Sequence, residues 1–210
     1  MAGKVAVVFD LDGTLIDSAP DLRGSLNRVL AERGLPPLST AAAGSMIGDG
    51  ARVLVERAWA AHGQAAGPAD LADFLADYEA NATVETVLYP GILEVLGRLK
   101  GDAHPLAICT NKPLAVTRII LEKLGLQRFF PVVIGGDSTS YRKPDPRHLE
   151  AAVTALGGAK AVMIGDHEND MAAARGLGIS SIFVSWGYGS ALGDYIARVP
   201  AELPGIIGLL

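Results

Sequence analysis

The feature that most constrains the fold is an alternation of short apolar runs with helical patterns over residues 85–186. Short runs that are almost entirely apolar are typical of strands buried on both faces of a parallel sheet. Counting one earlier run, they are Lys4–Phe9, Pro105–Cys109, Val132–Gly135, Ala161–Gly165 and Ser181–Ser185. Between them apolar residues recur at helical spacing, as in Ile92, Val95, Leu96 and Leu99. This alternation predicts an α/β fold with a doubly wound parallel sheet.

Residues 16–85 break this rhythm, because they show amphipathic helical patterns and no strand-like run. We therefore predict a core domain of residues 1–15 and 86–210, interrupted by an all-helical cap domain of residues 16–85. An insert at this point covers the carboxyl end of the first strand, where open α/β sheets bind ligands. Hinges are predicted near Asp17–Pro20 and Thr86–Gly91, where helix signals are weak.

Composition excludes several classes of protein. The net charge is -5 and no run of Lys and Arg occurs, so nucleic acid is not an expected partner. The apolar run Val5–Phe9 is far shorter than the roughly 20 residues that span a bilayer, so no membrane span or leader is expected. The single cysteine, Cys109, has no partner for an internal disulfide, and its apolar neighbours predict a packing role. We expect a cytoplasmic protein.

The first predicted strand ends in two carboxylates, Asp10 and Asp12. Two such groups placed together after a buried strand repel one another, and a divalent cation or a shared proton would offset that cost. Gly13 allows a sharp turn and Thr14 adds a hydroxyl. The alternative is an exposed loop in which the two Asp residues cap a helix.

Two further strand ends offer groups for an anion. The sequence Thr110-Asn111-Lys112 brings a hydroxyl and an amide that can donate to an oxyanion, although it also suits a helix start. In Arg142-Lys143-Pro144-Asp145-Pro146, two prolines restrict the backbone around Lys143. A lysine held in this way suits the neutralisation of phosphate charge, and the alternative is a surface loop that starts a helix.

The fourth strand end carries Asp166 and Asp170, four residues apart and therefore on one face of a starting helix. Their oxygens are ligands that Mg²⁺ prefers, although acidic residues also stabilise a helix N-terminus without any metal. Parallel strand ends meet at one edge of a sheet. The four strand ends together supply acids, a cation and oxyanion donors, which are the parts of a phosphoryl-transfer site.

The four segments resemble the ordered motifs of the haloacid dehalogenase-like phosphatases, and the similarity spans nearly the whole chain. The matching residues are Asp10-Leu11-Asp12-Gly13-Thr14-Leu15, Thr110-Asn111-Lys112, Lys143-Pro144-Asp145-Pro146 and Gly165-Asp166-x-x-Asn169-Asp170. Three other segments are similar to the phosphoglycolate phosphatase branch, namely Ile47-Gly48-Asp49-Gly50-Ala51, Trp186-Gly187-Tyr188-Gly189 and Glu202-Leu203-Pro204.

The resemblance implies a role for each matching residue. Asp10 would be the nucleophile that forms an aspartyl-phosphate, and Asp12 would be the general acid and base. Thr110 and Asn111 would hold the phosphoryl oxygens, while Lys143 would screen the nucleophile and the phosphate.

The resemblance also implies a Mg²⁺ site. Its ligands would be the carboxylates of Asp10 and Asp166 and the backbone carbonyl of Asp12. Asp170 would be a further ligand or would support the ligands from behind. A metal and a lysine would together offset the repulsion between an anionic nucleophile and an anionic ester.

Two residues have no role set by the motifs. His167 stands where this branch usually has Ser or Thr, and it is interpreted either as an exposed residue at a helix start or as a hydrogen-bonding neighbour of the metal ligands. Arg52 follows the turn Gly48-Asp49-Gly50 and is a candidate contact for the substrate from the cap. The alternative for Arg52 is a solvated helix face.

The expected function is a Mg²⁺-dependent phosphatase whose partner is a small phosphorylated metabolite, phosphoglycolate by resemblance. The alternative is a phosphotransferase of the β-phosphoglucomutase type, which shares the four motifs. A dehalogenase is disfavoured because Asp12 has no role in displacing halide. A non-catalytic module that senses metal or phosphate is a third possibility, disfavoured because Asp10 and Asp12 are both intact.

Overall fold

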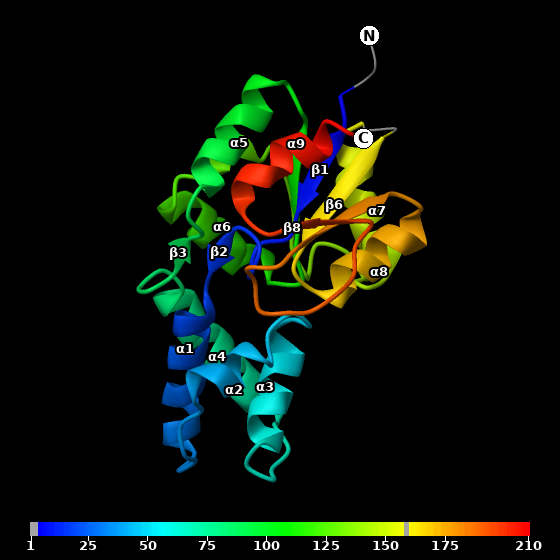
Figure 1. Cartoon of the computed structure of the whole chain (residues 1–210). Coiled ribbons are helices and arrows are strands. Elements are labelled where there is room, and N and C mark those ends of the chain that lie inside the picture. Colours follow the sequence, from blue (N-terminus) through cyan, green and yellow to red (C-terminus); the bar gives the residue numbers. More distant parts are fainter. Residues whose placement is uncertain (1–3, 158–159) are drawn as a thin grey trace.

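The computed structural model describes residues 4–157 and 160–210, and it contains a sheet-based core with a separate group of helices below it (Figure 1). The core is one six-stranded sheet in the order β5-β4-β1-β6-β7-β8, with every neighbouring pair parallel. The strands are β1 Ala6–Phe9, β4 Leu106–Cys109, β5 Val132–Ile134, β6 Ala161–Gly165, β7 Ser180–Val184 and β8 Tyr195–Ala197. The predicted doubly wound parallel sheet is confirmed.

Helices cover both faces of this sheet because successive strand side chains point to opposite sides. Val7 and Phe9 of β1 pack in the cluster that contains the apolar sides of α5 and α6, whereas Val8 packs with α7 and α8. Cys109 belongs to the second cluster, and burial raises the pKa of its thiol to about 12. The core helices are α5 Ile92–Gly101, α6 Leu114–Lys123, α7 Pro146–Ala155, α8 Glu168–Leu177 and α9 Leu203–Ile207, with 3₁₀ turns at Gln127–Phe129 and Pro200–Glu202.

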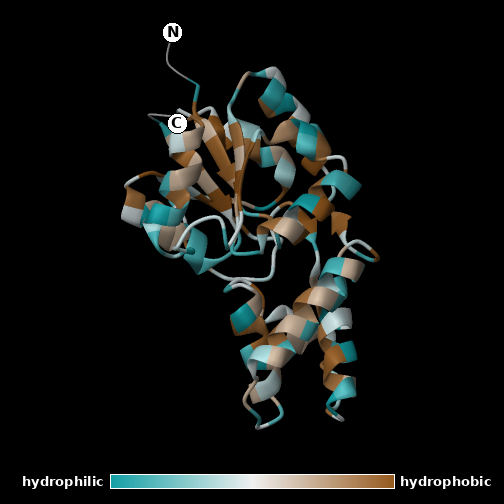
Figure 2. Cartoon of the chain, turned by 180° about the vertical axis from the view of Figure 1, so that it is seen from behind, coloured by the Kyte–Doolittle hydropathy of each residue, from teal (hydrophilic) through white to brown (hydrophobic). Residues whose placement is uncertain are grey.

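The four helices between β2 and β3 form the inserted group. They are α1 Ala19–Glu32, α2 Thr40–Gly44, α3 Ala51–Ala60 and α4 Pro68–Asn81. Their interior contains the fully buried side chains of Trp59, Phe74 and Tyr78, and the rings of the last two are stacked with centroids 5.7 Å apart. Figure 2 shows the contrast with the core, where the strands are hydrophobic throughout while the inserted helices have mixed faces.

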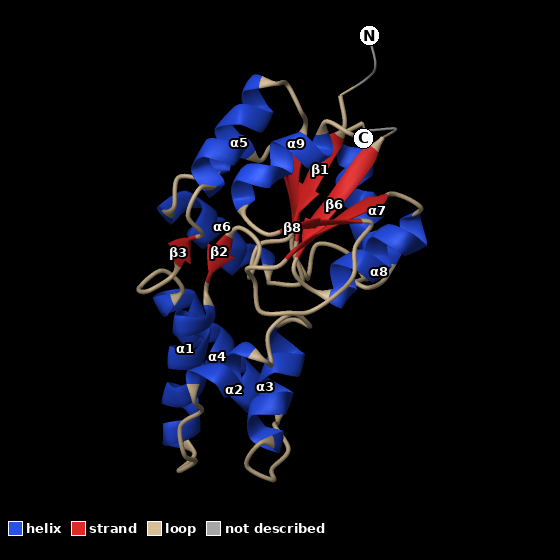
Figure 3. Ribbon diagram, in the orientation of Figure 1, coloured by secondary structure: helices blue, strands red, loops and turns tan. Residues whose placement is uncertain are grey.

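A two-stranded antiparallel ribbon joins the insert to the core (Figure 3). It pairs β2, Ile16–Asp17, with β3, Val87–Leu88. Beside it, the buried carboxylate of Asp21 accepts hydrogen bonds from the backbone N–H groups of Val84, Glu85 and Thr86 at 2.9–3.1 Å. The two chain crossings are therefore fastened to each other. The domain boundaries at 15/16 and 85/86 stay a prediction.

Three short strands were not predicted. The expectation of no strand in residues 16–85 is wrong for β2, because a strand of two residues leaves no apolar run to detect. β8 is an edge strand of three residues between Asp194 and Arg198, and β3 has only two. The predicted core domain also includes residues 1–3 and 158–159, which lie outside the described residues. Within the described residues, no helix has the length and apolar character needed to cross a membrane.

Candidate active site

The carboxyl ends of the three central strands bring the candidate residues to one edge of the sheet. Asp10 follows β1, Thr110 follows β4 and Asp166 follows β6. The first two extend the sheet ladder by one residue, since the Asp10 N–H donates to Ile164 O and the Thr110 N–H donates to Ile134 O, both at 2.9 Å. Backbone pairing therefore determines where these side chains begin, before any contact among the side chains themselves.

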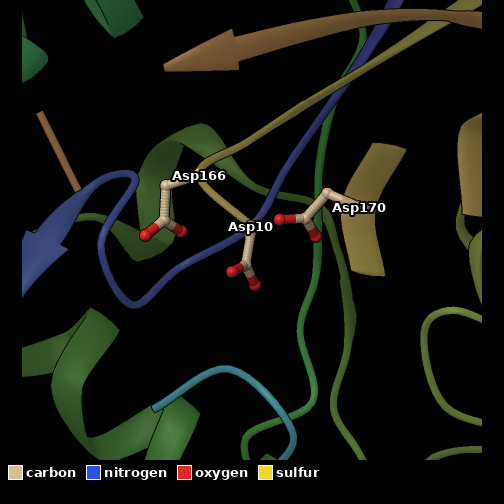
Figure 4. Close-up of side chains that lie close together, drawn as sticks. All are labelled: Asp10, Asp166 and Asp170. Atoms are coloured by element: carbon tan, nitrogen blue, oxygen red, sulfur yellow. The ribbon is translucent and has the colours of Figure 1, made fainter. Parts of the chain in front are cut away.

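Asp10, Asp166 and Asp170 form a buried acidic cluster (Figure 4). One oxygen from each carboxylate lies within 4.8 Å of the others. Lys143 Nζ is 2.8 Å from Asp10 Oδ1 and 2.6 Å from Asp170 Oδ1. The contact with Asp10 lacks hydrogen-bond alignment, so Asp10 Oδ1 is a buried acceptor without a hydrogen-bond donor among the described residues.

Negative charge is in excess in this cluster, because one lysine faces three carboxylates. Burial raises the pKa of Asp166 to about 6, with a further contribution from the charge of Asp10. Burial also raises the pKa of Asp170 to about 7, although Lys143 acts in the opposite direction. For Lys143, burial lowers the pKa, but Asp10 and Asp170 outweigh it and the pKa is raised. Such a site can hold a divalent cation on carboxylate oxygens.

Backbone groups hold Asp166 in place. Its Oδ2 accepts hydrogen bonds from the N–H groups of Tyr188 at 2.7 Å and Gly189 at 3.2 Å. Gly13 has a φ of +79°, and a Cβ atom there would lie 2.2 Å from Asp166 Oδ2. Only glycine fits at this point, since any side chain would displace the carboxylate.

A second buried pair joins Asp12 to Lys112. Lys112 Nζ lies 2.9 Å from both oxygens of the Asp12 carboxylate, and the Ser18 hydroxyl donates to Asp12 Oδ1. Burial is the largest single influence and lowers the pKa of Lys112, but Asp12 and Tyr78 together outweigh it and the pKa is raised, so the lysine is a cation. The sequence motifs assign Lys112 no separate role. Its place directly after Asn111 is the signal that could have marked it.

The two candidate phosphate-binding residues, Thr110 and Asn111, differ in whether a hydrogen-bond donor remains available for a ligand. The Thr110 hydroxyl accepts a hydrogen bond from the Lys112 N–H at 3.2 Å, and its own hydrogen can be donated to a ligand. The Asn111 amide instead joins parts of the protein. Its Nδ2 donates to Lys143 O at 2.9 Å and to Gly48 O at 3.1 Å, and its Oδ1 accepts from the Lys143 N–H.

His167 caps α8 and contacts the cap. Its Nδ1 accepts from the Asn169 N–H at 3.3 Å, and its ring lies so close to Gly48 that a Cβ atom there would be 2.7 Å from His167 Cδ2. Asn169 Nδ2 donates to Asp49 Oδ1 at 2.6 Å. The loop around Gly48 is thus docked on the core, and the site is covered.

A pocket with about 490 Å³ of empty space, part of it open to solvent, lies under this cover. Core residues around Asp10 and Asp12 line one side, and the cap contributes mostly apolar side chains, namely Leu22, Ile47, Ala51, Leu54, Phe74, Leu75 and Tyr78. Arg52 is exposed on α3 and does not line this pocket, so the structure does not bring it to the other candidates.

The loop after β7 supports the site from behind, which residue patterns did not indicate beyond the family likeness. Trp186 Nε1 donates to Thr14 O at 3.0 Å. The Tyr188 hydroxyl donates to Asp17 Oδ1 and accepts from the Ser18 N–H, both at 2.7 Å. This loop therefore joins the Asp166 side of the site to Asp17 and Ser18, in the segment predicted to be the first hinge.

Comparisons of the sequence and of the structure with known proteins lead to the same family. The family model for haloacid dehalogenase-like hydrolases matches residues 7–184. The phosphoglycolate phosphatase of Caulobacter vibrioides is 45% identical over 188 residues, covering 87% of this chain and 79% of that protein. That of Rhodospirillum rubrum is 44% identical over 193 residues, covering 87% and 80%. The crystal structure of a predicted phosphoglycolate phosphatase from Haemophilus somnus superposes with a TM-score of 0.90 at 30% identity, covering 98% of this chain and 99% of that one.

Proposed function

Because the chain belongs to the haloacid dehalogenase-like hydrolases and is a phosphoric monoester hydrolase, we propose that it hydrolyses phosphoglycolate or a similar small ester through a covalent intermediate on Asp10. The observation that carries this proposal is the position of Asp10. It ends the central strand, contacts Lys143 at 2.8 Å and lies beside two more carboxylates.

In the first step a carboxylate oxygen of Asp10 attacks phosphorus, and the bond from phosphorus to the ester oxygen breaks. For this step Asp12 has to be protonated when the ester binds; it transfers that proton to the ester oxygen, so the alcohol leaves without a charge. Lys143 and the Thr110 hydroxyl compensate the negative charge of the phosphoryl oxygens. Asn111 contributes by positioning, since its amide holds the Lys143 backbone at both N–H and C=O.

In the second step a water oxygen bonds to phosphorus, and the bond from phosphorus to Asp10 breaks. Asp12 is now a carboxylate and takes the proton from that water, which restores both residues. The docked Gly48 loop would exclude other water during the lifetime of the intermediate. Ser18 and Lys112 hold Asp12 in place for both transfers.

We propose Mg²⁺ as the metal. The residues fit a divalent cation, because three buried carboxylates share one lysine and Asp10 Oδ1 has no hydrogen-bond donor among the described residues. Asp10, Asp166 and the Asp12 backbone carbonyl would be ligands, with Asp170 as a further one. When bound, the ion neutralises phosphoryl charge and orients the ester. Lys143 also contacts Asp10 and Asp170, so it would compensate part of the charge that the metal leaves around the nucleophile.

The substrate class of the proposal is a small phosphorylated metabolite, consistent with the names of the relatives. The testing experiment measures phosphate release from phosphoglycolate and other phosphoesters, with Mg²⁺ or with EDTA. Enzyme quenched in acid during turnover is then mapped by mass spectrometry. We expect release only with the metal, and one phosphoryl group on the peptide that contains Asp10.

Two outcomes would contradict the proposal. A phosphoryl group on a different residue would remove the role of Asp10. Transfer to an added sugar phosphate without free phosphate would identify a phosphotransferase of the β-phosphoglucomutase type. The cytoplasmic location also stays a prediction, which fractionation of cells would check.

A further inference from the structure

The pocket contains a cation that the two proposed chemical steps do not use for the phosphoryl group. Lys112 is 95% buried, and its ammonium group is 2.9 Å from both oxygens of Asp12. An ammonium group has three donors, so two toward Asp12 leave one for another acceptor. Among the described residues that line this pocket, Lys112 alone is a lysine or arginine.

A hydroxyl group from the cap lies beside this lysine. The Tyr78 ring centroid is 4.6 Å from Lys112 Nζ, and Tyr78 lines the same pocket. The Tyr78 side chain is 98% buried, yet its hydroxyl has no hydrogen-bond partner among the described residues. Leaving a buried hydroxyl unpaired is unfavourable, so a ligand that pairs with it is favoured.

The chemistry of the proposed substrate places an anion close to Asp12. In phosphoglycolate one CH₂ group separates the ester oxygen from the carboxylate carbon. Asp12 must reach that ester oxygen to protonate it, so the carboxylate has to lie a few ångströms from Asp12. Lys112 is the cation in contact with Asp12, and the remaining cap lining is mainly apolar and offers no competing charge.

We propose that Lys112 and Tyr78 together bind the carboxylate of the substrate and so select esters with an anionic group next to the leaving oxygen. This inference rests on the proposed function. It makes substrate recognition a joint task of the core, through Lys112, and the cap, through α4. Because Tyr78 comes from the cap, the pair is complete only when the cap is docked.

The test compares phosphoglycolate with phosphoglycolamide, in which a neutral amide replaces the carboxylate. Wild type, Lys112→Met, Tyr78→Phe and the control Lys123→Met, an exposed lysine on α6, are assayed for kcat/KM on both esters. Lys112→Met also removes the partner of Asp12 and so slows both reactions. The ratio of the two kcat/KM values cancels that effect and reports carboxylate recognition alone.

We expect wild type and Lys123→Met to prefer phosphoglycolate by about 10- to 100-fold, as for one charge-assisted hydrogen-bonded contact. Lys112→Met should bring the ratio to about 1. Tyr78→Phe keeps the stacked ring and should lower the ratio by about 3- to 10-fold, as for one hydrogen bond to a charged group. It serves as the test if Lys112→Met does not fold.

Two other results would overturn this inference, and they differ in what they say about the proposed function. Equal losses on both esters in Lys112→Met and Tyr78→Phe, with the wild-type ratio kept, would overturn this inference and leave the proposed function intact. Release of phosphate from neither ester by wild type, with activity on other esters, would overturn the proposed substrate and this inference together.

Discussion

The site contains two buried lysines with different surroundings. Lys143 contacts two carboxylates, Asp10 and Asp170, and the carboxylate of Asp166 completes the same acidic cluster. Lys112 faces one carboxylate, Asp12, and lies 4.6 Å from the centroid of an aromatic ring. The first group has surplus negative charge and is suited to a cation. The second is balanced, has a donor left over, and is suited to an anion.

This difference shows how a single pocket can divide its tasks. The surplus charge belongs to strand ends of the core, whose positions the sheet determines. The balanced pair lies at the boundary with the cap, where Tyr78 completes it. The group around Lys143 therefore serves phosphoryl transfer and the group around Lys112 serves recognition of the substrate. Substitutions can perturb each group separately.

The largest effect should come from breaking the first group at its nucleophile. Asp10→Asn keeps the size of the side chain but removes the attacking charge, so turnover should fall by about 10⁴-fold or more. Phosphate release measures the loss, and circular dichroism checks that the fold is kept. Near-normal turnover in the purified variant would contradict a covalent intermediate.

Breaking the second group at Asp12 should cost less and depend on the leaving group. Asp12→Ala should slow hydrolysis of phosphoglycolate by about 10²–10⁴-fold, the usual contribution of a positioned acid and base. The loss should be smaller for p-nitrophenyl phosphate, whose leaving group needs little protonation. Mg²⁺ binding, followed by calorimetry, should persist because the backbone carbonyl remains. Equal losses on both esters would argue against the acid role.

The surplus charge of the first group should also appear in stability. Asp166 has a folded pKa of about 6 and Asp170 of about 7, above the ordinary value of 3.8. At pH values between 3.8 and the raised folded pKa, each of these two carboxyls holds more of its proton in the folded state than in the unfolded state. The free energy of unfolding of metal-free protein should therefore fall as pH rises from 5 to 7.5, by about 1–3 kcal/mol.

Urea denaturation in EDTA at both pH values measures this trend. Asp166→Asn keeps the acceptor for the Tyr188 N–H but cannot ionise, so it should be less pH-dependent and more stable than wild type at pH 7.5. Identical pH dependence in the two proteins would mean that Asp166 carries no such strain. Saturating Mg²⁺ should raise the stability of wild type at pH 7.5.

The smallest effect should come from Arg52, which the structure leaves exposed and outside both groups. A contact with the substrate stays a prediction for Arg52. Exposed charges contribute at most about 1 kcal/mol, so Arg52→Ala should raise KM for phosphoglycolate by no more than about fivefold. The KM for p-nitrophenyl phosphate serves as the control. No change on either ester would identify a solvated helix face.

Sequence patterns predicted the sheet and the acidic cluster well, for a physical reason. Runs such as Ala161–Gly165 are apolar throughout, and parallel pairing then brings their last residues to one edge. Local patterns did not reveal contacts between distant segments, such as Tyr78 against Lys112 or Asn169 against Asp49. These contacts depend on how the cap lies on the core, which no local spacing encodes. His167 was undecided for the same reason, since its ring packs on Gly48.

The ribbon of β2 and β3, with Asp21 holding residues 84–86, restricts how the cap can move. Two separate flexible linkers would let the cap move relative to the core in several directions. Because the two crossings are hydrogen-bonded to each other, we predict that the cap rotates mainly about the axis of this ribbon. The rotation angle of the cap would then determine both the distance of Tyr78 from Lys112 and whether the Gly48 loop is docked on the core. Cap closure would thus both complete the recognition of the ester and exclude water, and it would be controlled by the residues of the ribbon and Asp21, which do not contact the phosphoryl group.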